Sequence, residues 1–399
     1  MSKKYFLIIV MILLSFFTIY SLFLLNEGEM KNGDYKKEDV NVPLLSEDDF
    51  RLEKDIFNQS LFPTYTITKL NREIHDIASA DFNKDGIMDL LVTGWSNTSE
   101  IYIIYYLGNW NFTYEHIYSY DKDISGLVAG DFDNDGDIDI IFSSGENTYV
   151  NNVPYRINGT LNFLKSTGDI DYNKVLISKR TTGKIQDDEG RINPQLTSAD
   201  YDNDGDLDLL VGDNSGKVEL YLNDGEANFE SEGVLYDFGS MSSGLANADF
   251  DNDGDVDVIV SAYEKGNRSK GHVYLINNYL VESNNTYSFN HAGGEIIANV
   301  SFVPAVATLS TFDYDNDGDS DIIVSTSTIV YVLINKRNHF QALDIGYCKK
   351  TESTNYIDIQ PMYRVGLACA DFNDDGFTDF CLGTSDGFLR LFLNNYQEH

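Results

Sequence analysis

The sequence predicts an all-β protein, a β-propeller of six four-stranded blades that follows an N-terminal transmembrane helix. Three observations lead to this prediction. An acidic segment recurs six times at spacings of 49 to 69 residues. Each copy runs into short apolar strands separated by turns rich in Gly and Asn, and no stretch between the copies has a helical period. Repeats of this size and content are typical of propeller blades.

The N-terminus predicts a membrane anchor. Lys3 and Lys4 precede an uncharged run of 21 residues, 5–25. As a helix this run would be roughly 32 Å long, about the thickness of the hydrocarbon core of a bilayer. The two lysines predict a cytoplasmic tail at 1–4 and an extracellular location for the rest. The alternative is a cleaved signal peptide and a secreted protein, although the run is long for that and lacks a small-x-small cleavage site.

Residues 26–60 are dense in charge and have no hydrophobic period, so we expect a linker that holds the folded part, 61–399, away from the membrane. Seven Asn-x-Ser/Thr sequons are expected to lie in loops or in this linker, which permits glycosylation of an exported protein. They begin at Asn58, Asn97, Asn111, Asn158, Asn267, Asn284 and Asn299.

The acidic segments, which we call loops 1 to 6, each contain nine residues that begin and end with Asp. They are Asp81–Asp89, Asp131–Asp139, Asp200–Asp208, Asp249–Asp257, Asp313–Asp321 and Asp371–Asp379. After loop 3 the pattern predicts a strand at 208–211, a second at 217–222 and a third that starts near Phe229. A further strand, at 244–248, precedes loop 4. Four short antiparallel strands in each unit make a propeller blade.

The two ends of the chain predict how the ring closes. Only six residues follow Leu393, so the last unit has no outer strand of its own. A strand-like segment without a blade, Phe62–Leu70, lies at the other end and can supply that strand, which removes an exposed sheet edge. The alternative is seven blades, with one divergent blade inside the insertion at 146–190.

Each loop offers oxygen ligands at alternate positions, with a carboxylate or amide at positions 1, 3, 5 and 9 and a backbone carbonyl at position 7. Gly at position 6 permits the left-handed turn that wraps the chain around an ion. The predicted metal residues are Asp81, Asn83, Asp85, Ile87 and Asp89; Asp131, Asp133, Asp135, Asp137 and Asp139; Asp200, Asp202, Asp204, Asp206 and Asp208; Asp249, Asp251, Asp253, Asp255 and Asp257; Asp313, Asp315, Asp317, Asp319 and Asp321; and Asp371, Asn373, Asp375, Phe377 and Asp379.

This ligand set favours about six structural Ca²⁺ ions over Mg²⁺, because all the donors are protein oxygens on a flexible loop. An EF-hand is excluded because position 12, where it needs Glu, is apolar in every copy, as at Val92 and Leu382. Two carboxylates about 5 Å apart repel by roughly 3 kcal/mol at an effective dielectric near 20. A divalent ion in each loop would therefore relieve a large repulsion.

These repeats resemble the FG-GAP/VCBS repeats of the integrin alpha-subunit propeller and its prokaryotic relatives, over about residues 62–399. The resemblance implies a propeller whose loops bind Ca²⁺ on one face, with adhesive or carbohydrate-binding roles outside the cell. The Phe-Gly half of the repeat is weak, as at Ser125-Gly126, and Gly-Ala-Pro is absent after the strand, as at Ser143-Ser144-Gly145. These departures favour the looser VCBS-like group.

The expected function is that of a binding module for an extracellular protein or glycan, without catalysis. A formal charge of −36 excludes nucleic acid as a partner. Gly383–Gly387 matches the pattern of a nucleophile elbow, but a strand is expected after it where the elbow needs a helix. Two alternatives stay open: the propeller of a carbohydrate-active enzyme such as a polysaccharide lyase, and a structural component of a cell-surface assembly. Cys369 and Cys381 flank loop 6 and could form a cross-strand disulfide, which would leave Cys348 free; free or buried thiols are the alternative.

Overall fold

In the computed structural model, the residues that the structure describes all belong to one compact unit. It describes residues 54–55, 64–108, 110–150, 153–168, 173–175, 195–213, 216–239, 242–264, 267–279, 289, 294–301, 308–326, 329–336, 339–347, 366–384 and 387–396. The predicted tail and membrane helix at 1–25 lie outside these residues. Within them, no helix is both long and apolar enough to span a bilayer.

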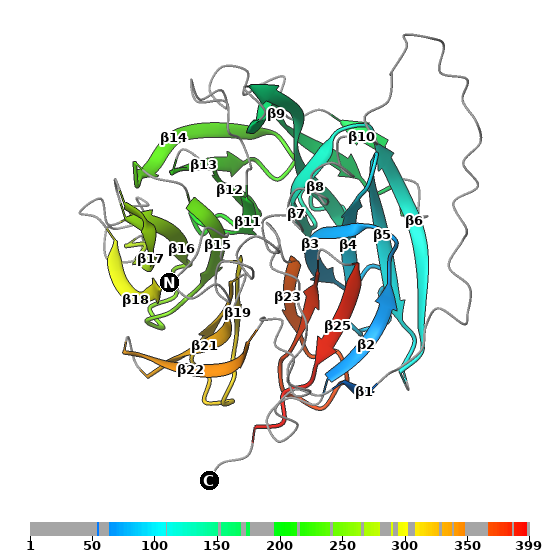
Figure 1. Ribbon diagram of the computed structural model, residues 1–399. Coiled ribbons are helices and arrows are strands. Elements are labelled where there is room, and N and C mark those ends of the chain that lie inside the picture. The colour runs from blue at the N-terminus through cyan, green and yellow to red at the C-terminus, as the bar shows by residue number, and fades with distance from the viewer. Residues whose placement is uncertain are drawn as a thin grey trace, which may run out of the picture. The chain divides into compact units, whose positions relative to one another are not determined.

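The described residues form six antiparallel sheets arranged around a common centre (Figure 1). Blades 1 to 3 are three of these sheets. Blade 1 contains β3 (Glu73–Ala80), β4 (Asp89–Trp95), β5 (Ser99–Tyr106) and β6 (Phe112–Tyr120); blade 2 contains β7 (Asp123–Gly130), β8 (Asp139–Val150), β9 (Val153–Lys165) and β10 (Asn173–Val175); blade 3 contains β11 (Gln195–Ala199), β12 (Asp208–Gly212), β13 (Lys217–Asn223) and β14 (Phe229–Asp237).

Blades 4 to 6 are the other three sheets. Blade 4 contains β15 (Ser242–Ala248), β16 (Asp257–Glu264), β17 (Asn267–Ile276) and β18 (Glu295–Ser301); blade 5 contains β19 (Thr308–Phe312), β20 (Asp321–Ser325), β21 (Ile329–Asn335) and β22 (Phe340–Tyr347); blade 6 contains β23 (Gly366–Ala370), β24 (Asp379–Gly383), β25 (Phe388–Phe392), β2 (Thr64–Lys69) and β1 (Lys54–Asp55). The strands predicted around loops 3 and 4 are confirmed, with bounds that differ by at most two residues.

The innermost strand of each blade lies against the innermost strands of the two neighbouring blades. In order around the centre these are β3, β7, β11, β15, β19 and β23, and β23 lies against β3 again (Figure 1). Among the described residues the ring therefore closes after six blades, and the alternative of a seventh is not supported. The described part of the insertion, through β8, β9 and β10, belongs to blade 2.

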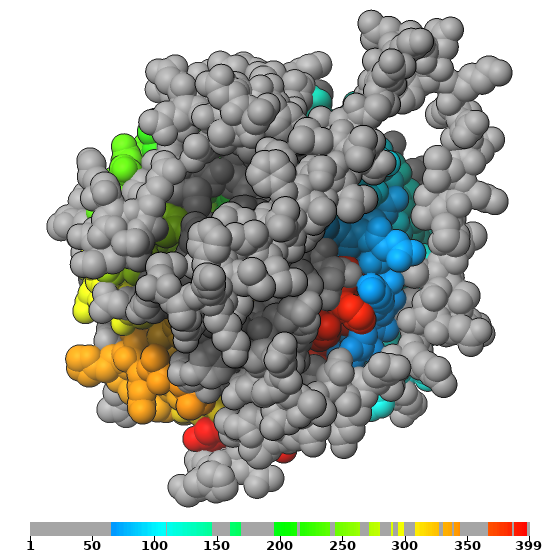
Figure 2. Space-filling view, in the orientation of Figure 1, coloured from blue at the N-terminus to red at the C-terminus, as the bar shows by residue number. Residues whose placement is uncertain are grey.

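The last blade is completed by the N-terminal strand, as predicted. β2 pairs antiparallel with β25, with Thr64 opposite Phe392 and Lys69 opposite Phe388. In Figure 2 the N-terminal part of the propeller, in blue, lies beside the C-terminal part, in red. β1 pairs with β2 and extends the same sheet, so Lys54 and Asp55, inside the predicted linker, are part of the fold.

The second strand of a blade is buried on both faces, because the next blade packs on each side of it. All residues of β12, β20 and β24 are buried, which explains their continuous apolar sequences. The apolar clusters span neighbouring blades: one joins Leu210 of blade 3 to Val258 of blade 4. The ring thus has apolar cores between its blades, and the loops at one end of those strands are held by a rigid base.

The structure answers the question of the cysteine pair in favour of free thiols, and one expectation, the placement of the sequons, needs correction. The cysteine pair does not form a disulfide: Cys381 lies opposite Ala368 and Cys369 lies opposite Phe380, so the two side chains point to opposite faces of the sheet, and both thiols are free. Cys348 lies outside the described residues. Not all sequons lie in loops, because Asn158, Asn267 and Asn299 belong to β9, β17 and β18. Asn97 and Asn111 are in exposed turns.

Candidate metal centres in the acidic loops

Each acidic loop connects the first strand of its blade to the second and is folded by its own carboxylates. The Asp at position 1 accepts the N–H of position 5 at 3.0–3.2 Å and the N–H of the Gly at position 6 at 2.8–3.0 Å. Position 5 accepts the N–H of position 7. Position 6 has φ of 87–99° and position 4 has φ of 55–60°, so two residues in every loop are left-handed.

The Asp at position 9 anchors the loop to the blade. It has no exposed surface in any copy. Its Oδ2 accepts the N–H of position 2, and its Oδ1 accepts an N–H just beyond or at the end of the blade's third strand, as from Asn223 to Asp208 at 2.9 Å. Burial raises the pKa of these carboxyls, to about 6 for Asp89, about 7 for Asp208 and about 8 for Asp379.

Loops 2 to 5 each bring three carboxylates to one point. In each of these loops, oxygens of positions 1, 3 and 9 lie within 4.8 Å of one another. Oδ1 of the position 3 Asp is buried and accepts no hydrogen bond in any of the four. These orphan oxygens belong to Asp133, Asp202, Asp251 and Asp315. A buried carboxylate oxygen without a donor is costly, and a cation within the cluster supplies what it lacks.

Loops 1 and 6 differ because they carry Asn at position 3. Oδ1 of Asn83 accepts the N–H of Asp85 at 2.9 Å, and Oδ1 of Asn373 accepts the N–H of Asp375 at 3.0 Å. The amide oxygen is therefore satisfied within the loop. The side chains at positions 1, 3, 5 and 9 also carry one negative charge fewer, so the case for an ion is weaker here than in loops 2 to 5.

In loops 2 and 5, a lysine from elsewhere in the blade contacts the Asp residues at positions 3 and 5. Lys165 Nζ pairs with Asp133 and lies 2.9 Å from Oδ2 of Asp135. Lys336 Nζ pairs with Asp315 and lies 2.9 Å from Oδ2 of Asp317. The hydrogen bond from each lysine lowers the pKa of the position 5 carboxyl.

In loops 3 and 4, no lysine among the described residues pairs with the carboxylate at position 3. Burial, followed by repulsion from neighbouring carboxylates, raises the pKa of Asp202 and of Asp251. Loops 3 and 4 therefore hold the least compensated negative charge.

A family model described as an FG-GAP-like repeat matches residues 62–142 and 200–260, which include loops 1, 2, 3 and 4. Over these residues the chain matches FG-GAP-like repeats. No curated protein sequence matches the chain. Among solved structures, BBS1N in complex with ARL6DN, soaked with mercury, is 10% identical with a TM-score of 0.47 over 87% of this chain and 98% of that one. The BP39L lectin from Burkholderia pseudomallei is 13% identical with a TM-score of 0.50 over 81% and 82%. At this identity the likeness concerns the fold alone.

Neighbouring acidic loops are joined by the side chains at position 4, which the loop pattern did not identify as functional. The side chain at position 4 of one loop donates to the Asp at position 7 of the next. Lys84 donates to Asp137, Asn134 to Asp206, Asn203 to Asp255 and Asn252 to Asp319, at 2.5–3.1 Å. Position 7 is Phe377 in loop 6 and Ile87 in loop 1, so these two side chains cannot accept such a bond. The predicted contribution of position 7 as a ligand, through its backbone carbonyl, stays a prediction.

A buried Asn forms a second link between blades. Asn278 donates its backbone N–H to Asp257 of its own blade and its side-chain amide to the carbonyl of Tyr201 in the preceding blade, at 3.0 Å. Three other residues repeat this double contact: Asn223, Asn335 and Asn394. The sequence signal for this link is an Asn that recurs at the end of the third strand or just after it. This signal does not identify the partner, because the partner lies in another blade.

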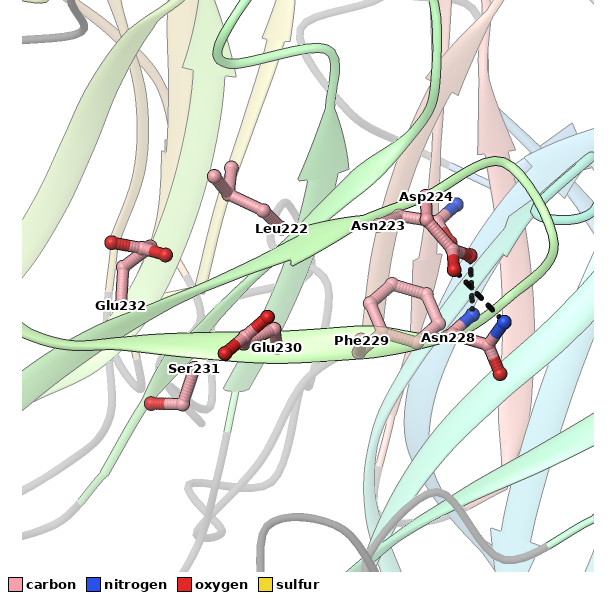
Figure 3. Close-up of a pocket in the computed structure, with 8 residues that line it drawn as sticks. All are labelled: Leu222, Asn223, Asp224, Asn228, Phe229, Glu230, Ser231 and Glu232. Carbon is pink, nitrogen blue, oxygen red and sulfur yellow. Dashed lines mark hydrogen bonds between the residues drawn. The ribbon is translucent and has the colours of Figure 1, made fainter.

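Two hollows lie apart from the predicted ligands. A groove of about 430 Å³ follows the hairpin of β13 and β14 (Figure 3). At its turn, Asp224 accepts hydrogen bonds from the backbone and side-chain amides of Asn228, and Glu230 and Glu232 line it farther along. A cavity of about 270 Å³ lies at the centre, lined by the innermost strands of all the described blades.

The aromatic residue Trp110 has a packing role. Its ring stacks on Tyr65 of β2, with centroids 4.8 Å apart and planes 15° apart. It thereby joins the turn between β5 and β6 of blade 1 to the closing strand of blade 6.

Proposed function

We propose that the protein is a calcium-stabilised binding module, held outside the cell by its N-terminal segment. The observation that carries the calcium part is the orphan carboxylate oxygen at position 3, repeated in loops 2 to 5 beside the carboxylates of positions 1 and 9. All of these donors are hard oxygens, which suit Ca²⁺.

The residues that fit an ion are the same in each of these loops. In loop 3 they are Asp200, Asp202 and Asp208, with Asp204 and the carbonyl of position 7 as further donors. Asp200 accepts two backbone N–H groups of the loop, and Asp208 accepts one from the loop and one from Asn223, so both present fixed oxygens to the cation. The ion supplies charge compensation there and stiffens the loop. We propose no catalytic role for it.

The ligand part of the proposal rests on the ring and its surface. A closed propeller offers rigid loops and hollows to a partner, and the groove on blade 3 presents the side chains of Glu230, Glu232 and Asn228 and the hydroxyl of Ser231. Carboxylates, amides and a hydroxyl suit the hydroxyl groups of a glycan or the cationic groups of a protein. Screening the full chain on glycan and protein arrays, with calcium present, tests this part; the variant Glu230→Gln/Glu232→Gln should lose the signal.

Metal analysis tests the calcium part. We expect about four calcium ions on the full chain, purified in mild detergent and equilibrated with millimolar calcium. We also expect a clear fall in melting temperature after chelation. Fewer than three ions per chain, or the same melting temperature in chelator, would contradict the proposal.

A further inference from the structure

We propose that Lys165 and Lys336 are built-in counter-cations of loops 2 and 5, which compete with calcium and divide the loops into strong and weak sites. The inference rests on the calcium sites proposed above. It begins with a contrast within one molecule: loops 2 to 5 share their carboxylates at positions 1, 3, 5 and 9, but a lysine contacts positions 3 and 5 in loops 2 and 5.

The two lysines reach the same carboxylates from different places in the blade. Lys165 is the last residue of β9, directly before Ser166, whose N–H binds Asp139. Lys336 comes directly after Asn335, whose N–H binds Asp321. One lysine thus precedes the anchoring N–H and the other follows it. The same contact from two different register positions indicates that the charge matters rather than one backbone position.

The lysines are placed so that they can yield. Their side chains are 38% and 48% exposed, whereas the position 3 side chains that they contact are 10% and 5% exposed. A long side chain with its ammonium at the surface can turn toward water, while the carboxylate stays in place. An incoming calcium ion must then displace an ammonium group in loops 2 and 5.

Among the residues that the structure describes, no lysine contacts loop 3 or loop 4 at these positions. The residues that correspond to Lys165 and Lys336 are Leu222 and Asp224 in blade 3 and Asn277 and Tyr279 in blade 4. The amide of Asn277 is 3.5 Å from Asp251, and it is neutral. Within the described part of the chain, calcium entering loops 3 and 4 therefore displaces no ammonium group. We expect these two loops to bind calcium more tightly than loops 2 and 5, by on the order of tenfold.

Calcium titration calorimetry on the full chain in detergent tests the competition. Wild type should show two classes of site, with loops 3 and 4 as the tighter class. Lys165→Met/Lys336→Met should tighten the weaker class by on the order of tenfold and merge the two. Lys217→Met is the control, because this lysine starts β13 at the end away from the acidic loops. Equal affinities in wild type, or a weaker class that the double variant leaves unchanged, would overturn the proposal while leaving calcium binding itself established.

Melting of the metal-free protein gives a readout that does not depend on calcium binding. Without metal, the double variant should melt about 2 °C or more below wild type and below Lys217→Met, because the largely buried carboxylates of Asp133 and Asp315 lose the ammonium groups that pair with them. With calcium the difference should vanish or reverse. If the double variant melts like wild type in both conditions, the lysines are not counter-cations. If no variant binds calcium but the metal-free difference is present, the calcium proposal fails and the competition with it, while the lysines remain counter-ions.

Discussion

At the scale of the residue, position 3 distinguishes one acidic loop from another. A single atom separates Asp from Asn, yet Oδ1 of Asn83 is bonded within its loop whereas Oδ1 of Asp202 accepts nothing. The natural Asn in loops 1 and 6 shows that the same turn forms without that carboxylate. The carboxylate at position 3 is therefore not needed to fold the loop, which indicates a role toward a ligand.

This leads to a prediction for Asp202→Asn. The substitution copies loop 1 into loop 3, so we expect the loss of one tight calcium site with the fold kept. The metal-free protein should melt at the same temperature or higher, because one repelling carboxylate is gone. Calorimetry and thermal melting measure the two effects. A lower melting temperature without metal would mean that Asp202 stabilises the loop by itself.

A second prediction concerns the buried Asn residues. Asn278 is 1% exposed and joins blades 3 and 4 through its side chain. Asn278→Ala leaves the carbonyl of Tyr201 without this donor, and we expect a loss of about 1–3 kcal/mol in the free energy of unfolding. The loss should be similar with and without calcium, since the contact does not involve a metal ligand's side chain.

Asn228→Ala is the matched control for this prediction. Its amide donates to Asp224 within one hairpin, in an exposed setting, so its removal should cost less than Asn278→Ala. Urea unfolding of both variants, in calcium and in chelator, makes the comparison. Equal costs for the two variants would remove the case for a link between blades.

At the scale of the element, the sequence predicts the strand that closes the ring but not the hydrogen bonds between blades. β2 was predictable from the number of strands, because the last unit lacks an outer strand of its own and the N-terminal segment Phe62–Leu70 has no blade of its own. Asn278 and Tyr201 are 77 residues apart in sequence, and Asn223 and Phe132 are 91 apart. Repeat patterns identify what each blade contains, but contacts between blades depend on how the blades are rotated against each other.

The closing strand gives the third prediction. β2 pairs with the outer edge of β25. The chain then continues into blade 1, and just after β2 the N–H of Leu70 binds the carbonyl of Gly387 at 2.8 Å. Gly387 has φ of 85°, and a Cβ there would lie 1.9 Å from the carbonyl oxygen of Leu70. The strand and the turn are therefore fitted closely to each other.

We expect a chain that starts at Phe62 to melt like the full chain, and a chain that starts at Asn71 to unfold at lower temperature and to aggregate, because β25 becomes an exposed edge. Thermal melting with light scattering measures both. The variant Gly387→Ala should lower the melting temperature in the longer chain. If removal of 62–70 leaves melting unchanged, β2 does not hold the ring closed.

At the scale of the whole molecule, the sequence predicted the ring, the blade number and the face that carries the acidic loops. It overestimated the likeness among the loops. The sequence distinguishes loops 1 and 6 by their Asn at position 3, but only the structure separates loops 2 and 5, which contact a lysine, from loops 3 and 4, which contact none among the described residues. The lysines lie outside the repeat, so the motif alone could not identify them.

The last prediction concerns pH. Burial raises the pKa of the position 9 carboxyls, to about 7 in Asp139, Asp257 and Asp321. An unfolded Asp titrates near 3.9. In the folded, metal-free protein these carboxyls therefore bind protons more tightly than in the unfolded chain, so the stability that they contribute is fully present below about pH 4 and is lost as the pH rises through about 7.

Calcium should reverse this slope, because the ion binds ionised carboxylates and competes with protons for them. Between pH 5 and pH 8 we expect the melting temperature to fall in metal-free buffer and to rise in millimolar calcium, so that the two curves diverge. Differential scanning calorimetry at several pH values tests this. Parallel curves would mean that the protons and the calcium act at different sites, and the position 9 carboxyls would then be anchors of the loops without being ligands.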